Sequence, residues 1–216
     1  MKDIPFFTSP NGIAALTLRE IPYTGRAYVK ILDSLKPEAL LAECHSFCRA
    51  CGAELILASG DPALEKYPVH ATLIRMCRRR EGMESRGAML FPVTAETARK
   101  WRQIYNERMA DIPNAAYMTS AEEKKLLEKN DAYFVHRGGE LLGIGRASGE
   151  TIDAVAAVQP GAGADVVLAL AELLTGDAAY LTVAKENTRA VKLYERMGFT
   201  AVAETSKWFR IVTQDE

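Results

Sequence analysis

Apolar and polar positions follow two different periods along this chain of 216 residues. Short apolar runs rich in β-branched and aromatic residues are bounded by glycine, proline and polar clusters, which is typical of strands. These runs lie at 13–20, 26–32, 54–58, 70–77, 88–93, 132–137, 140–147, 151–158, 180–184 and 200–212. Apolar residues that recur at helical spacing predict helices over 37–50, 95–109, 120–130, 164–174 and 188–197.

The order of these elements indicates the type of sheet. Gly138-Gly139 and Ser148-Gly149 separate three consecutive strands, and such dipeptides at short intervals predict tight antiparallel hairpins. The apolar helix at 164–174 then separates two strands, as in a parallel crossover. We therefore predict an α/β fold with a mixed sheet and helices on both faces.

A polar, charged and glycine-flanked segment at 78–87 predicts a boundary between two parts of the chain. Residues 1–86 would form a smaller N-terminal α/β subdomain and residues 87–216 the main domain. The segment begins with three arginines, Arg78 to Arg80, which suit either a phosphate contact or a solvated linker.

Composition excludes several classes of protein. Hydrophobic residues make up 48% of the chain and charged residues 25%, and the formal net charge of -1 provides no basic field for nucleic acid or membrane. No apolar run approaches the roughly 20 residues that span a bilayer, and Asp3 and Pro5 stand where a signal peptide would be apolar. We expect a cytoplasmic protein with no nucleic-acid or membrane partner.

Cysteine spacing indicates packing rather than metal binding. Cys44, Cys48 and Cys51 fall on one face of the helix predicted at 37–50, where small core-facing residues are expected. Disulfides are not expected in the cytoplasm, and no second paired-ligand motif completes a zinc site.

The stretch 180–199 is the most informative part of the chain. A short strand is followed by a helix for which Thr188 can serve as the N-cap, and Gly198 ends the helix with Phe199 returning over the turn. Asn187 and Tyr194 lie at the two ends of this strand-loop-helix unit.

Over residues 88–212 the chain resembles the N-acetyltransferase superfamily known as GNAT. The resemblance rests on Leu181-Thr-Val-Ala184, Asn187, Ala190 and the segment Leu193-Tyr-Glu-Arg-Met-Gly-Phe199. It implies a GNAT-like acyl-CoA N-acyltransferase fold, with acetyl-CoA as co-substrate between the fourth and fifth strands. The order of strands and helix in residues 1–86 echoes part of this domain, which suggests a degenerate GNAT-like half without a coenzyme site.

The family's second signature is a pyrophosphate loop, Arg/Gln-x-x-Gly-x-Gly/Ala, between the fourth strand and the next helix. One alignment begins at Gln159 and places Ala162 where the family has glycine. The shifted alignment keeps Gly161 and Gly163 but places Pro160 where the family has arginine. Glycines permit close backbone approach and a helix start can bind an anion, whereas Asp165 would repel a phosphate.

The resemblance also implies roles for individual residues. Tyr194 would be the general acid that protonates the departing thiolate, or else a core residue with its hydroxyl at the rim. Asn187 would anchor the pantetheine arm or act only as a cap. Asp153 and Glu204 are candidate bases, His136 is another, and water chains are a further route. The predicted coenzyme contacts are Ala157, Val158, Gln159, Gly161, Ala162, Gly163, Ala164, Asn187, Arg189 and Tyr194.

The function predicted from this resemblance is transfer of an acetyl group from acetyl-CoA directly to a primary amine of a small molecule or peptide. The alternative is a non-catalytic GNAT-like module that binds acyl-CoA or serves in regulation or scaffolding. A homodimer is a further expectation.

Overall fold

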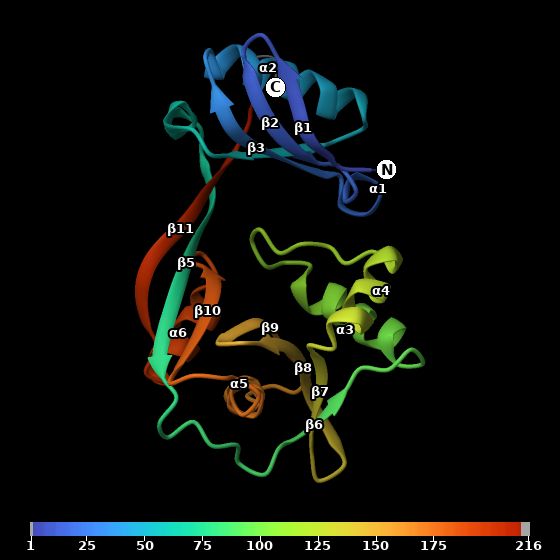
Figure 1. Ribbon diagram of the computed structural model, residues 1–216, viewed down its shortest axis with the longest axis vertical. Helices are drawn as coiled ribbons and strands as arrows, with labels where there is room; N and C mark the ends of the chain where they lie inside the picture. The colour runs from blue at the N-terminus through green and yellow to red at the C-terminus, as the bar shows by residue number, and fades with distance from the viewer. Residues whose placement is uncertain (1, 213–216) are drawn as a thin grey trace. The chain divides into compact units, whose positions relative to one another are not determined.

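The computed structural model describes residues 2–212 and contains two compact units (Figure 1). Among the described residues, unit 1 comprises 2–72 together with 205–212, and unit 2 comprises Leu73–Glu204. The division therefore falls at residue 72 rather than near residue 86, because strand β5 (Val69–Arg79) leaves unit 1 and pairs with a strand of unit 2.

In unit 1 an antiparallel meander, β1-β2-β3, is followed by a helix and by a strand parallel to β3. Strand β1 was not predicted. It contains Pro5, and its residues are half-buried or exposed, so the strand lacks a clear pattern of buried and exposed positions. The elements are β1 (Ile4–Ser9), β2 (Gly12–Thr17), α1 (Ile21–Thr24), β3 (Arg26–Ser34), α2 (Pro37–Ala50), β4 (Leu55–Ser59) and η1 (Pro62–Lys66).

Unit 2 contains the predicted mixed sheet, with strand order β5-β10-β9-β8-β7-β6. Its strands pair antiparallel except for β9 and β10, which are parallel and are joined by the crossover helix α5. The elements are β6 (Met89–Pro92), α3 (Ala98–Met109), α4 (Ser120–Lys129), β7 (Ala132–Arg137), β8 (Glu140–Ser148), β9 (Thr151–Ala157), α5 (Gly163–Ala171), β10 (Ala178–Ala184), α6 (Thr188–Arg196) and β11 (Thr200–Arg210).

The two units repeat one order of elements: β1-β2-β3-α2-β4 in unit 1 and β7-β8-β9-α5-β10 in unit 2. The strand that follows each repeat is exchanged. β5 pairs antiparallel with β10, while the end of β11 pairs antiparallel with β4 through Phe209 and Ala58. This repetition is what the hypothesis of a GNAT-like N-terminal half requires.

Helix α5 is apolar on nearly every side and lies directly on β8. Its residues 166–171 are all buried in the main core of unit 2. A Cβ atom at Gly145 would lie 2.3 Å from Leu170 Cδ1, and one at Gly143 would lie 2.8 Å from Val166 Cγ2. The two glycines therefore allow the helix to approach the strand closely, which holds the start of α5 in a defined place.

The arginine run at Arg78 to Arg80 binds backbone carbonyls. Arg78 donates to the carbonyl of Met197 at the end of α6 and to those of Glu81 and Gly82, and Arg80 donates to the carbonyl of Gly176. Orphan carbonyls at helix ends and turns need such donors. Arg78 and Arg80 therefore serve as donors to backbone carbonyls. Neither of the two roles predicted from the sequence, a phosphate contact or a solvated linker, applies to them.

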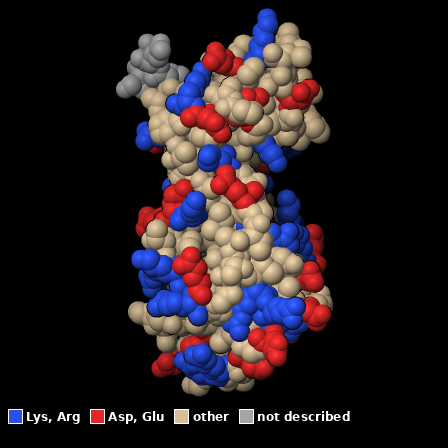
Figure 2. Space-filling model, turned by 90° about the vertical axis from the view of Figure 1, so that its left-hand side faces the viewer, with Lys and Arg blue, Asp and Glu red and all other residues tan. Residues whose placement is uncertain are grey.

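Charged side chains of both signs are interspersed on the face shown in Figure 2. Among residues 2–212, no helix combines the length and the apolar character needed to cross a membrane.

The predicted packing of the cysteines is confirmed for Cys44 and Cys48, which are fully buried on the core side of α2, whereas Cys51 is half-buried. Burial raises the pKa of both buried thiols to about 12. Because the thiolate is the reactive form, these two thiols are inert at neutral pH.

His45 on the same helix predicts a pH dependence of stability. Burial, with a smaller effect from Arg49, lowers its pKa below the ordinary 6.5. Below pH 6.5 the folded protein therefore binds fewer protons at His45 than the unfolded chain does. The contribution of neutral His45 to the free energy of unfolding is complete above pH 6.5 and is lost as the pH falls. We expect His45→Gln to lose less stability than wild type between pH 7.5 and about 5.5, measured by urea unfolding. Equal losses would contradict the assignment.

Candidate active site

Strands β9 and β10 separate soon after they begin. They pair only through Thr151 with Tyr180 and Ile152 with Leu181. Beyond these pairs β9 continues to Ala157 without a partner on its β10 side in the described part of the chain. The corresponding strands of unit 1, β3 and β4, stay paired over 26–30 and 55–59. An open edge suited to an extended ligand is therefore present in unit 2, and its counterpart in unit 1 is closed.

A β-bulge lies where the strands separate. In the register between β8 and β9, Arg146 pairs with Ala154 and Ala147 pairs with Ile152. Asp153 is therefore the extra residue of the bulge. Its exposed side chain accepts a hydrogen bond from the Ser148 hydroxyl at 3.2 Å. The structure thus places this predicted base beside the point where β9 leaves β10.

The loop that leads from β9 to α5 presents free amides. Gly161 has a φ of 85°, a left-handed conformation that favours glycine. A Cβ atom at this position would have no neighbouring atom within 4 Å, so the loop is open to solvent there. The amides of Gly161, Gly163 and Ala164 have no backbone acceptor among residues 2–212. The start of α5 can therefore accept an anion.

Other predicted loop contacts are already engaged within the protein. The amides of Val158 and Gln159 both donate to the carbonyl of Leu142 at 2.9 and 3.2 Å. The Gln159 side chain donates to Glu140 at 3.2 Å, and the buried Ala162 packs in the core. Ala157 is half-buried at the end of β9, on the open edge.

Two arginines that the sequence analysis did not single out lie at this loop. Arg137, at the end of β7, makes an ion pair of 3.1 Å with Asp165 in the first turn of α5. Arg108 of α3 donates to the carbonyl of Val158 at 3.0 Å. Neither arginine is near the loop in sequence, and no local pattern could have identified it. Arg137 offsets the charge of Asp165, the acid expected to repel a phosphate.

The N-cap of helix α6 lies one residue earlier than predicted. Asn187, rather than Thr188, is the N-cap, and its side-chain oxygen accepts a hydrogen bond from the amide of Ala190 at 3.2 Å. The capping interpretation of Asn187 is therefore confirmed, and its side-chain NH₂ group remains available as a donor. Arg189 is exposed on the same helix and lines a shallow hollow with Lys192, Glu195 and Arg196.

The predicted glycine stop of α6 is confirmed. Gly198 has a φ of 87°, and the amide of Phe199 donates to the carbonyl of Tyr194 at 2.9 Å. This is a Schellman turn, and the hydrophobic contact that accompanies it joins the rings of Phe199 and Tyr194 at 5.9 Å. The turn therefore holds the Tyr194 ring in place.

Tyr194 is 8% exposed and packs in the same core as α5. Within residues 2–212 its hydroxyl makes no hydrogen bond, and the hydroxyl oxygen is not completely buried. The hydroxyl therefore reaches solvent at the edge of the core. Burial raises the pKa of Tyr194 to about 12, so the phenol is protonated throughout the neutral range.

The remaining candidate bases lie elsewhere on the sheet. Glu204 is exposed on β11, whose neighbours in the sheet are β4 and β5. The His136 ring on β7 packs edge to face on Phe91 of the edge strand β6, with ring centroids 5.2 Å apart. Of the three candidates, only Asp153 lies where β9 and β10 separate.

The sequence matches no protein-family model and no curated protein. Similar folds occur among solved structures. A GCN5-related N-acetyltransferase from Anabaena variabilis is 11% identical with a TM-score of 0.60, and the match covers 93% of this chain and 59% of that one. One from Sphaerobacter thermophilus is 14% identical with a TM-score of 0.51, covering 92% and 76%.

A functionally unknown conserved protein from Staphylococcus epidermidis is 11% identical with a TM-score of 0.59, and the match covers 97% of this chain and 92% of that one. At these identities the comparisons concern the fold. The chain therefore has the fold of the GCN5-related N-acetyltransferases, the GNAT superfamily that its sequence resembles.

Proposed function

We propose that this protein is an N-acetyltransferase that moves the acetyl group of acetyl-CoA directly to a primary amine of a small molecule or peptide. The observation that carries the proposal is the separation of β9 from β10 after two residue pairs, in a unit where α5 and Tyr194 share one core. A cytoplasmic location and a homodimer stay predictions.

The start of α5 fits the pyrophosphate of a coenzyme. Three free amides, at Gly161, Gly163 and Ala164, are available to phosphate oxygens. Arg137, whose side chain is 44% exposed, supplies a cation at the first turn of the helix. It takes the place of the arginine that the family has in the loop itself. The open edge of β9 offers backbone groups to the amides of the pantetheine arm.

Acetyl-CoA, when bound, would supply an acetyl thioester that is already activated toward amines. The Tyr194 hydroxyl would donate a hydrogen bond to the sulfur as the carbon–sulfur bond breaks. With a pKa of about 12 the phenol is a weaker acid than a thiol, whose pKa is ~8.5, so it acts chiefly as a hydrogen-bond donor to the developing charge. Asp153 would accept the proton that the amine loses as the nitrogen–carbon bond forms.

A non-catalytic GNAT-like module that binds acyl-CoA or serves in regulation or scaffolding remains the second candidate. Two observations favour it: the Gln159 side chain is hydrogen-bonded to Glu140, and the side-chain oxygen of Asn187 serves in the cap of α6. Both groups are thereby less available to a coenzyme.

Thermal denaturation with acetyl-CoA and with CoA tests both candidates. A ligand at 100 times its Kd stabilises a fold by about 2.7 kcal/mol, so each coenzyme should raise the Tm. Arg137→Gln should weaken coenzyme binding about tenfold, because it removes the cation and leaves Asp165 unpaired. Arg99→Gln makes the same charge change at an exposed position of α3 and should bind as wild type does. No shift at millimolar coenzyme would overturn both the acetyltransferase and the acyl-CoA-binding module.

A further inference from the structure

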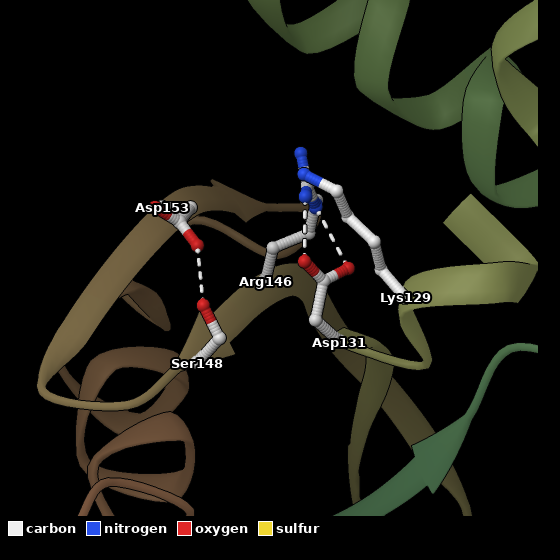
Figure 3. Close-up of a pocket in the computed structure, with 5 residues that line it drawn as sticks. All are labelled: Lys129, Asp131, Arg146, Ser148 and Asp153. Carbon is white, nitrogen blue, oxygen red and sulfur yellow. Dashed lines mark hydrogen bonds and ion pairs between the residues drawn. The ribbon is translucent and has the colours of Figure 1, made fainter. Parts of the chain in front are cut away.

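A polar hollow of about 570 Å³ lies in unit 2, and the proposed coenzyme chemistry does not account for all of its side chains. It is formed where the end of α4 meets β8 and β9 (Figure 3). The residues that line it are Lys129, Asp131, Arg146, Ser148 and Asp153.

Two of these residues form a closed ion pair. The Asp131 carboxylate accepts two hydrogen bonds from the Arg146 guanidinium, at 3.0 and 2.6 Å. The side chains are 7% and 22% exposed, so the pair is largely shielded from water. Asp131 is thereby used within the protein. The Nη1 amino group of Arg146 makes no hydrogen bond among the described residues and stays available to a ligand.

The other two charges lie on different sides of the hollow. Lys129, in the last turn of α4, is exposed, makes no ion pair within residues 2–212, and extends toward Arg146 (Figure 3). Asp153 lies across the hollow, held by the Ser148 hydroxyl. The hollow therefore has a cationic side, formed by Lys129 with Arg146, and an anionic side at Asp153.

We infer that this hollow binds the acceptor and that the acceptor is an amine that also carries a carboxylate, such as a free amino acid. Its carboxylate would be held by Lys129 and the free edge of Arg146, since guanidinium and ammonium groups are the usual carboxylate partners. Its amine would face Asp153, beside the point where β9 leaves β10. The inference rests on the proposed function and names the substrate class of the same site.

Matched ligand pairs test this class. Glycine, L-alanine, L-glutamate and L-lysine are each compared with the corresponding amide by titration into protein saturated with CoA. Each free acid should bind about tenfold more tightly than its amide, which lacks the carboxylate charge. In Lys129→Gln this preference should fall about tenfold. The KM for each free acid, measured by free-thiol release from acetyl-CoA, should rise by the same factor. Lys125→Gln, an equal charge change at an exposed position of α4, should keep the wild-type preference.

The outcomes separate the two proposals. If neither coenzyme binds, the proposed function fails, and titration of the same pairs into the free protein still tests the charge preference of the hollow. If coenzyme binds but acids and amides bind equally, the substrate class is overturned while the proposed function stands. The substrate class is also overturned if Lys129→Gln and Lys125→Gln keep the same preference.

Discussion

Replacing Tyr194 with phenylalanine is expected to lower kcat by about 10²- to 10³-fold, the usual cost of removing one positioned hydrogen-bond donor to a developing negative charge. The ring stays packed against Phe199, so the core and the turn after α6 are preserved and the affinity for CoA should change little. Free-thiol release measures kcat, and the thermal shift with CoA measures binding. Tyr67→Phe, which removes a hydroxyl from unit 1, serves as the control.

The pH profile adds a second readout for Tyr194. The Tyr194 hydroxyl must be protonated to donate its hydrogen bond, so its contribution to kcat is lost as the pH rises through its pKa. Burial moves that pKa from 10 to about 12, and a falling limb caused by Tyr194 should therefore appear only above about pH 11. A kcat of Tyr194→Phe equal to that of wild type would remove this residue from the mechanism.

Replacing Asp131 with asparagine is expected to lower the free energy of unfolding by about 3 kcal/mol. Asp131 is buried and holds Arg146 through two hydrogen bonds, so the neutral side chain would leave the guanidinium uncompensated in a shielded place. Denaturant unfolding measures the change. Asp153→Asn removes the same charge from an exposed position and should change stability by less than about 0.5 kcal/mol.

Equal stability of the two aspartate variants would mean that the Asp131–Arg146 pair is not structural. If the larger loss is found for Asp131→Asn, Arg146 in the hollow is a preorganised group whose free edge is held in position by its partner.

Local patterns predicted most of the elements of unit 2 correctly. The hairpin dipeptides predicted the β7-β8-β9 meander, and the capping box predicted the start of α4, where Thr119 and Glu122 bond each other's backbone. Gly198 predicted the end of α6. Such signals depend on neighbouring residues, so they can be read without the fold.

Strand pairing was not predictable in the same way. The pattern at 70–77 indicated a strand, but nothing in it named β10 as the partner. The exchange that places the end of β11 beside β4 joins residues far apart in the chain. The alternation of apolar and polar residues is the same whether a strand pairs with a neighbour in sequence or with a distant strand. The partner is therefore decided by the packing of the whole sheet.

By itself the sequence determined the order of strands and helices, the apolar character of α5, and the motif that places Tyr194 in a helix closed by Gly198, because each depends on short-range periodicity and turn chemistry. Only the tertiary structure decided that β9 leaves β10 after two pairs, that Arg137 meets Asp165, and that Lys129 and Asp153 line one hollow. These relations are set by sheet register and by contacts between side chains distant in sequence, which carry no local pattern.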